Sequence, residues 1–405
     1  MNNLTKAYHE HRDKIFILGA ILMVILLPIQ KVSTSIAFVV LCVGFVVGTK
    51  EFKITQSNQK FFLVVLTGYY VLHVISSLFS TYTMYAKNDL WIKAPLLILP
   101  LIFSLRAPLA SVIRKTIWRL YLASTLLVSL FLYLRIIYCF ILNHRLLSNV
   151  ELVDYTIIHP SYLACYLLTG AMAMWLEPSL NEIKEKKNLI SMLSTLILIA
   201  ILFLGSRIII VLSILFLVYL IFSNLSIRKS LGSSAVLLIM IAIVIWKVPA
   251  LNERFGKGLN MFTQSSLEVN QYTVDDRLMT WKNTLELIKD KPFFGYTNGD
   301  YCYHYLKEKH NSSGFGKGYR QRLNAHNQVL ESQLSMGILG SILFLTLFGE
   351  AFWIAWSSQH KMMLGFLIVC FSFAMVESIF QSQGGVMFFG FFIGLFLNEL
   401  KHIRS

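Results

Sequence analysis

Charged residues are scarce in this sequence. Only 14% of its 405 residues are Asp, Glu, Lys or Arg, whereas 56% are hydrophobic. A soluble globular domain contains about 25% charged residues, so the composition argues against a soluble protein and favours an integral membrane protein. The charges are also unbalanced, with 36 basic and 21 acidic side chains. In a membrane protein that excess has to be read by position along the chain.

Patterns that bind metals or form disulfides are also sparse. Four of the five cysteines lie in apolar runs and Cys302 stands alone in a polar segment, so the sequence offers neither a disulfide framework nor a CxxC metal site. The pair Asp275-Asp276 fits the start of a helix better than a magnesium site. We therefore expect neither a metal nor a cofactor.

Apolar runs make up most of the chain. A helix that crosses a bilayer needs about 20 predominantly apolar residues. The polar segment Met1–Lys14 leads into the first run without a small-residue cleavage site, so that run is expected to be retained as a span. The tract Leu189–Phe222 is too long for one crossing and is expected to turn at Gly205-Ser206-Arg207. Twelve spans are predicted: Ile15–Ile29, Val32–Gly48, Phe61–Phe79, Leu90–Leu105, Ile117–Leu142, Ile157–Leu176, Leu189–Leu204, Ile208–Phe222, Leu231–Val248, Gln328–Trp356, Met362–Ile379 and Val386–Leu400.

One long polar segment divides these spans. The sequence therefore predicts an all-α integral membrane protein in three parts. Residues 1–250 form transmembrane helices 1–9, residues 251–325 form a large outer loop that contains short helices, and residues 326–405 form transmembrane helices 10–12.

Basic residues predict which side of the membrane each connection faces. Alternate short connections hold clusters of Lys and Arg, whereas the connections between them hold isolated ones. Because clustered Lys and Arg favour the cytoplasmic side, both termini are expected inside and the long loop outside. The clustered residues are Lys50, Lys53, Lys60, Arg106, Arg114, Lys115, Lys184, Lys186, Lys187, Arg228, Lys229, Lys401 and Arg404.

A helix is predicted within the outer loop. Leu278, Trp281, Leu285 and Ile288 recur at intervals of three and four residues, which is typical of an amphipathic helix. The helix would start at Asp275-Asp276 and end before Pro292.

His326 is a candidate catalytic residue because it stands where the outer loop meets the tenth span. If the helix began there, His326 would share one face with Leu330, Gln333, Gly337 and Gly340. A neutral imidazole with a pKa of about 6.5 is suited to taking a proton from an attacking hydroxyl group. The alternative is an interfacial histidine that caps a span.

Two arginines are candidates for binding an anion. Arg207 stands where two tightly connected spans meet the outer surface, and a guanidinium group there could hold a phosphate through two parallel hydrogen bonds. The alternative for Arg207 is an interface anchor. Arg277 lies in the first turn of the loop helix, and its alternative is a solvated helix charge.

Four further residues carry weaker signals. Arg320 and Arg322 stand beside glycines and fit a solvated loop equally well. Glu377, at the outer end of the eleventh span, could orient His326, bind sugar hydroxyls or make a hydrogen bond within the helix bundle. His159, at the outer start of the sixth span, has the same ambiguity.

Three segments, taken in order, resemble the O-antigen ligase and polymerase superfamily of bacterial envelope enzymes. The first is Gly205-Ser206-Arg207 at the start of a span. The second runs from Asp276-Arg277-Leu278-Met279-Thr280-Trp281 to Lys291-Pro292-Phe293-Phe294-Gly295-Tyr296. The third is His326-Asn327-Gln328-Val329-Leu330-Glu331 followed by Gly337-Ile338-Leu339-Gly340. The order of the segments, the outer loop and the number of spans extend the likeness over the whole chain.

The resemblance implies a GT-C-like helical membrane fold and a metal-independent, inverting glycosyltransferase in the bacterial inner membrane, with its active site on the periplasmic face. The donor would be a glycan on undecaprenyl pyrophosphate, and the acceptor a sugar hydroxyl of lipid A-core. His326 would activate the acceptor hydroxyl, while Arg207 and Arg277 would bind the donor pyrophosphate. Apart from the resemblance, the further candidates for supporting roles are Asn327, Glu331, Arg320, Arg322, Glu377 and His159.

Other functions remain open at this stage. A polymerase would extend the lipid-linked glycan itself, and a protein O-oligosaccharyltransferase would use a protein hydroxyl. A polytopic transporter is a different class, but the two halves of the chain show no evident internal repeat. The polar residues also gather at the outer face and not at the bilayer midplane, where the substrate sites of carriers usually lie. No feature of the sequence points to nucleic acid.

Overall fold

The computed structural model describes residues 2–48, 57–144, 152–153, 158–180, 182, 186–224, 226–247 and 276–400. Every regular element within these ranges is helical, which confirms the all-α prediction for them. The first 25 residues of the predicted outer loop, 251–275, and several of the basic connections lie outside the described residues.

Each predicted span overlaps a helix, although α16 ends at Ala374, before the predicted end at Ile379. The twelve helices concerned are α1 (Asn2–Leu26), α2 (Lys31–Val47), α3 (Ser57–Leu78), α4 (Thr83–Leu105), α5 (Ser111–Asn143), α6 (Pro160–Leu176), α8 (Lys187–Leu204), α9 (Arg207–Asn224), α10 (Ile227–Lys247), α15 (Gln328–Ser357), α16 (Lys361–Ala374) and α17 (Gln383–Leu400). Within the described part of the chain, six of them are long and apolar enough to cross a membrane, namely α3, α4, α5, α8, α15 and α17. Shorter apolar helices occur at Val32–Val47, Arg207–Ser223 and Lys361–Ala374. These helices identify a multi-pass membrane protein, while twelve crossings remain a prediction.

The predicted turn between the seventh and eighth spans is confirmed. Helix α8 ends at Leu204 and α9 begins at Arg207. Gly205 takes a left-handed conformation (φ 65°), and its N–H donates to the carbonyl groups of Ile201 and Leu202. A glycine after the last helical residue adopts that conformation without a side-chain clash, so the two helices can be joined by two residues.

The last helix is the centre of the bundle. All of its residues from Gly384 to Leu400 are buried. Gly390 and Gly394 let α17 lie against α4, because an added Cβ would stand 2.8 Å from the Pro95 carbonyl oxygen and 3.1 Å from that of Leu99. Small residues at such crossings allow two membrane helices to approach closely.

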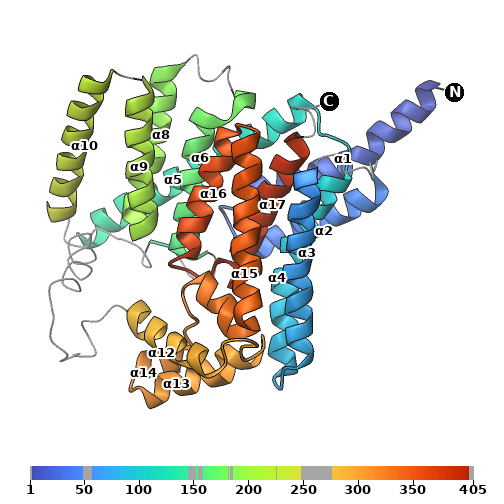
Figure 1. Ribbon diagram of the computed structural model, residues 1–405. Coiled ribbons are helices and arrows are strands. Elements are labelled where there is room, and N and C mark those ends of the chain that lie inside the picture. The colour runs from blue at the N-terminus through green and yellow to red at the C-terminus, as the bar shows by residue number, and fades with distance from the viewer. Residues whose placement is uncertain are drawn as a thin grey trace.

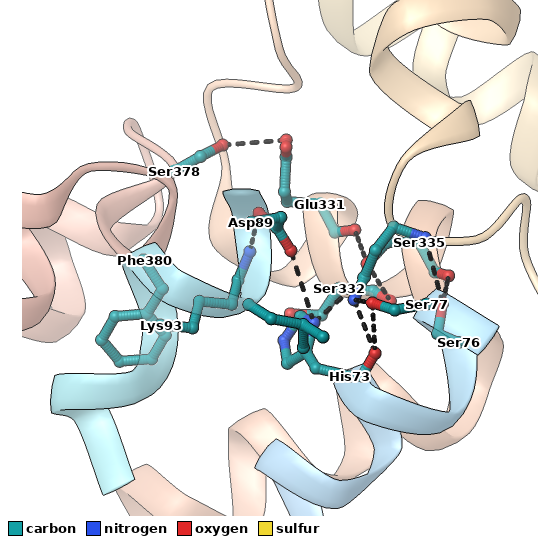
Figure 2. Close-up of polar contacts among 12 residues, drawn as sticks. His73, Ser76, Ser77, Asp89, Lys93, Glu331, Ser332, Ser335, Ser378 and Phe380 are labelled. Carbon is teal, nitrogen blue, oxygen red and sulfur yellow. Dashed lines mark hydrogen bonds and ion pairs between the residues drawn. The ribbon is translucent and has the colours of Figure 1, made fainter. Parts of the chain in front are cut away.

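A lysine inside α4 is paired within the bundle. Lys93 is fully buried and forms an ion pair with Asp89, one turn earlier on the same helix (Figure 2). Charged residues in membrane spans are costly unless they face the protein interior and pair there. The pair explains how the short predicted span Leu90–Leu105 tolerates a lysine.

The described part of the predicted outer loop, residues 276–325, forms a group of short helices at one end of the bundle (Figure 1). These are α12 (Asp276–Asp290), the π-helix η3 (Tyr301–Leu306), α13 (Lys307–Ser312) and α14 (Gly316–Gln321). Asp300 attaches this group to the connection between α3 and α4, because its carboxylate accepts hydrogen bonds from the Ser80 hydroxyl (2.6 Å) and the Tyr82 N–H (2.9 Å). Outside this group, two short 3₁₀ helices are η2 (Pro178–Leu180) and η4 (Ile379–Gln381).

Helix α15 is broken at Gly337, which has non-helical angles (φ 69°, ψ −166°). The backbone around Pro292 fills the break. The Ile338 N–H donates to the Pro292 carbonyl (3.0 Å) and the Tyr296 N–H donates to the Leu334 carbonyl (2.7 Å). Residues 338–357 alone are long enough, at 1.5 Å per residue, to cross a hydrocarbon core of about 30 Å. The part of α15 before Gly337 is not needed for such a crossing, and it lies against the segment that follows α12.

Candidate functional site

His326 lies in the turn before α15 and not on the helix. Its backbone has a left-handed conformation (φ 46°), and α15 begins two residues later at Gln328. The prediction that His326 shares a helical face with Leu330 and Gly337 is therefore wrong. The reason is Asn327, whose Oδ1 accepts hydrogen bonds from the N–H groups of Val329 (2.9 Å) and Leu330 (3.1 Å) and so caps the helix after His326.

The imidazole of His326 is held by a carboxylate. His326 Nδ1 lies 2.6 Å from Glu377 Oε2, and the Glu377 side chain is 8% exposed, compared with 23% for His326. Because a carboxylate accepts a hydrogen bond, Nδ1 carries the proton in this pair, and in the neutral imidazole Nε2 then has the lone pair. An imidazole held in this way can accept a proton at Nε2.

Arg277 contacts the same carboxylate. Its Nη2 lies 3.6 Å from Glu377 Oε1, so Glu377 uses one oxygen for His326 and the other for Arg277. Arg277 is the second residue of α12, which places it at the amino-terminal end of that helix. The structure thus brings together two of the three residues that the sequence singled out.

The charge of Glu377 is stabilised by its neighbours. Burial favours the neutral carboxyl, but the hydrogen bond from His326 and the electrostatic interactions with His326, Arg277 and His159 outweigh burial and lower the pKa of Glu377 below its ordinary value. Glu377 is consequently ionised at neutral pH. The start of α6, which His159 caps, lies near the cluster, since the Tyr162 hydroxyl donates to the Ser378 carbonyl (3.4 Å). His159 Nδ1 accepts the Ser161 N–H (3.2 Å) at the start of α6.

Glu331 connects the two segments that carry His326 and Glu377. It is fully buried, and its Oε2 accepts hydrogen bonds from the Ala325 N–H (2.8 Å) and the Ser378 hydroxyl (3.0 Å; Figure 2). The Tyr301 hydroxyl donates to the other oxygen. Ala325 precedes His326 and Ser378 follows Glu377, so one carboxylate fixes the spacing of the pair.

Asn327 and Gln328 reinforce this arrangement. Asn327 Nδ2 donates to the Met375 carbonyl (2.9 Å), and Gln328 Oε1 accepts the Phe380 N–H (2.8 Å). The polar residues that follow His326 in the sequence therefore fasten the start of α15 to residues 375–380.

Arg207 reaches the same end of the bundle through the alternation of the helices. Helix α6 starts beside the cluster at His159, α8 starts at the opposite end and returns, and α9 starts with Arg207 (Figure 1). This alternation puts the start of α9, and with it Arg207, at the end of the bundle where α6 begins. The direct contacts described above join His326, Glu377 and Arg277.

The two remaining arginines lie on the outer group of short helices. Arg322 ends α14 in a left-handed conformation (φ 50°), and its guanidinium lies over the Tyr303 ring, 5.3 Å from the centroid. Arg320 is exposed on α14. Neither is part of the contacts around Glu377 that the structure describes.

Sequence reasoning did not identify Tyr301 and Ser378. Both hydroxyl groups donate to Glu331, but Tyr301 lies in a polar loop and Ser378 in a short serine- and glutamine-rich segment. Neither position has a spacing relative to Glu331 that indicates a contact.

The fold and the site together define a polytopic membrane protein with an oriented imidazole and an adjacent guanidinium at one end of the bundle. Residues 192–345 match the family model described as O-antigen ligase. The match confirms the resemblance to the O-antigen ligase superfamily. It supports an activity of the ligase or polymerase type, in a family of glycosyltransferase-like enzymes of lipopolysaccharide biosynthesis. A search of curated proteins finds no match.

The matched segment contains Arg207, Arg277, His326 and Glu331, whereas Glu377 and His159 lie outside it. The contact between His326 and Glu377 is therefore an observation of the structure that the family match does not include.

Proposed function

We propose that this protein is an O-antigen ligase. It transfers a glycan from undecaprenyl pyrophosphate to a sugar hydroxyl of lipid A-core, on the periplasmic face of the bacterial inner membrane, with both termini in the cytoplasm. The observation that carries the proposal is the cluster in which Glu377 contacts His326 through one oxygen and Arg277 through the other.

In the proposed reaction, Nε2 of His326 takes the proton of the acceptor hydroxyl. The acceptor oxygen then forms a bond to the anomeric carbon of the donor sugar, and the bond from that carbon to the pyrophosphate oxygen breaks on the opposite face. The configuration at the anomeric carbon inverts, and undecaprenyl pyrophosphate leaves with the bonding electron pair.

Glu377 supports this step in two ways. It fixes the imidazole so that Nε2 is the basic nitrogen, and its negative charge stabilises the imidazolium that forms. Arg277, and Arg207 from the start of α9, supply positive charge to the pyrophosphate leaving group. In the proposal these guanidinium groups take the place of a metal ion.

Glycan analysis of a deletion strain tests the proposal. The gene is deleted, and the strain is complemented with the His326→Ala variant. The variant is expected to be present in the membrane, but the strain should accumulate the lipid-linked donor and make lipopolysaccharide that ends at bare core. Complementation with His304→Ala, which changes an exposed histidine on η3, is expected to restore long-chain lipopolysaccharide. Long-chain lipopolysaccharide of wild-type length with His326→Ala contradicts the proposal.

The same gels distinguish a ligase from a polymerase. Loss of a polymerase leaves lipopolysaccharide with a single repeat, because attachment to core still occurs. Bare core supports the ligase, and a single-repeat band assigns the site to polymerisation. A glycoprotein that disappears while lipopolysaccharide stays normal assigns it to protein O-glycosylation.

A further inference from the structure

Two adjacent phenylalanines project from the segment between α12 and η3. Phe293 is 70% exposed and Phe294 is 89% exposed. Phenylalanine is usually buried, and two neighbouring rings that face away from the protein form an apolar surface that requires an explanation.

The backbone holds these two rings in place. The Pro292 carbonyl accepts hydrogen bonds from the Ile338 N–H (3.0 Å) and from Gln333 Nε2 (3.1 Å). On the other side of the pair, the Tyr296 N–H donates to the Leu334 carbonyl (2.7 Å). The segment is therefore fastened to α15 at both ends, and the backbone that carries the rings cannot turn inward without breaking these bonds.

This attachment places the rings where the exposed apolar surface of α15 begins. Within α15, the exposed large apolar side chains start directly after Gly337, at Ile338 and Leu339, and continue at Ile342. None of the residues of α15 before Gly337 is exposed. Phe293 touches this boundary, since its carbonyl oxygen would lie 1.9 Å from a Cβ on Gly337.

Helix α12 also has an exposed face that includes apolar side chains. Its exposed residues include Leu278 and Leu285, with Lys282 and Lys289 each four residues further on. Residues at these intervals share one side of a helix. A helix face that combines apolar and basic side chains is typical of an element that lies on an anionic membrane surface.

We propose that the Phe293–Phe294 pair and this face of α12 dock onto the bilayer that α15 crosses. The two rings insert among the acyl chains of the outer leaflet, and the lysines lie at the level of the anionic headgroups. The occupant of the surface is lipid, because the surface continues the lipid-facing side of α15 and carries positive charge where headgroup phosphates lie.

Docking also fixes the depth of Arg277, the second residue of α12. This one consequence rests on the proposed function: docking keeps the guanidinium at the level of a lipid diphosphate. The docking itself does not depend on any catalytic activity.

Site-directed spin labelling tests the docking. The five native cysteines are replaced by serine or alanine, and a nitroxide is attached to Phe294→Cys or to Ser312→Cys on α13 as a control. Both positions are exposed, so neither substitution removes packing. The full-length protein is placed in nanodiscs of phosphatidylethanolamine and phosphatidylglycerol. Collisions of the label with oxygen, which concentrates in the bilayer, are compared with collisions with a water-soluble nickel chelate.

The label at position 294 is expected to be accessible to oxygen and protected from the nickel chelate, whereas the label at position 312 shows the reverse. Equal access of the chelate to both labels overturns the proposal, because position 294 is then in water. Protection of position 294 from both reagents also overturns it, since the surface is then covered by protein. The measurement involves no glycan transfer, so its failure is distinguishable from failure of the proposed function.

Discussion

Nδ1 of His326 lies 2.6 Å from Oε2 of Glu377, although 51 positions separate the two residues in the sequence. The carboxylate is nearly buried and its second oxygen is 3.6 Å from Arg277. Glu377 therefore connects the group that accepts a proton in the proposed reaction with a group that binds the leaving phosphate. This relationship gives Glu377 a larger role than the sequence alone indicates.

Removing the charge of Glu377 is expected to slow transfer. Glu377→Gln keeps the size of the side chain, but it no longer fixes the imidazole tautomer or stabilises an imidazolium. Its transfer rate should fall by about 100-fold or more, the usual effect of losing one such electrostatic contact. The measurement is the rate of glycan transfer by membranes with equal amounts of protein. The control is Glu350→Gln. Glu350 lies on α15, as Glu331 does, but near the other end of the helix, and the variant should retain activity. Equal rates for the two variants contradict the role of Glu377.

Replacement of Arg277 is expected to weaken leaving-group stabilisation. Arg277→Ala should lower the transfer rate by about 100-fold or more. Arg277→Lys should restore only part of that loss, because an ammonium group cannot make two parallel hydrogen bonds to a phosphate. Arg320→Ala, which changes an exposed arginine on α14, should leave the rate near that of the wild type. If Arg320→Ala and Arg277→Ala are equally impaired, the assignment of Arg277 is wrong.

The break in α15 makes Gly337 sensitive to substitution. An alanine at this position would need a left-handed conformation (φ 69°), and its Cβ would lie 1.9 Å from the Phe293 carbonyl oxygen. Gly337→Ala should therefore lower the thermal unfolding temperature and displace the segment around Pro292. Gly349→Ala in the same helix has no atom within 4 Å of the added Cβ. It should be neutral or stabilising by up to about 1 kcal/mol. Equal unfolding temperatures for both variants contradict this account of the break.

The stability of the protein is expected to depend on pH through Glu177, which follows the last residue of α6. Burial, followed by the charge of Glu399, raises the pKa of Glu177 from its ordinary value of 4.5 to about 7. The folded protein then binds this proton more tightly than the unfolded chain, so the folded state loses stability as the pH rises from about 4.5 to about 7. Glu177→Gln should remove that loss, and its advantage in unfolding temperature should be larger at about pH 8 than at about pH 5. A difference that does not change with pH contradicts the raised pKa.

The helical fold was predictable from the sequence because apolar runs and their lengths are a local signal. Each of the twelve predicted spans overlaps a helix, and the turn at Gly205 was placed correctly. The amphipathic pattern from Leu278 to Ile288 also predicted α12, which spans Asp276–Asp290. The break at Gly337 was not predictable, because it depends on backbone from a distant segment entering α15.

The site was predictable only in its chemistry. His326 and Arg277 could be selected by residue type and by their position at the outer surface, but no local pattern shows that both contact Glu377. The conformation of His326 was predicted wrongly because Asn327 caps α15, so the helix begins at Gln328, two residues after His326. The role of Glu331 depends on Ala325, Tyr301 and Ser378, which come together only in the folded chain.

Transfer by the purified protein tests the central claim most directly. The wild type, His326→Ala and the control His304→Ala are reconstituted in vesicles with an undecaprenyl pyrophosphate-linked glycan and lipid A-core, and the glycosylated core is quantified over time. The account predicts that His326→Ala binds the donor but transfers it more slowly by about 100- to 10,000-fold, the range attributed to general acid–base catalysis. The control variant should match the wild type. A His326→Ala variant that forms glycosylated core at the wild-type rate contradicts the account.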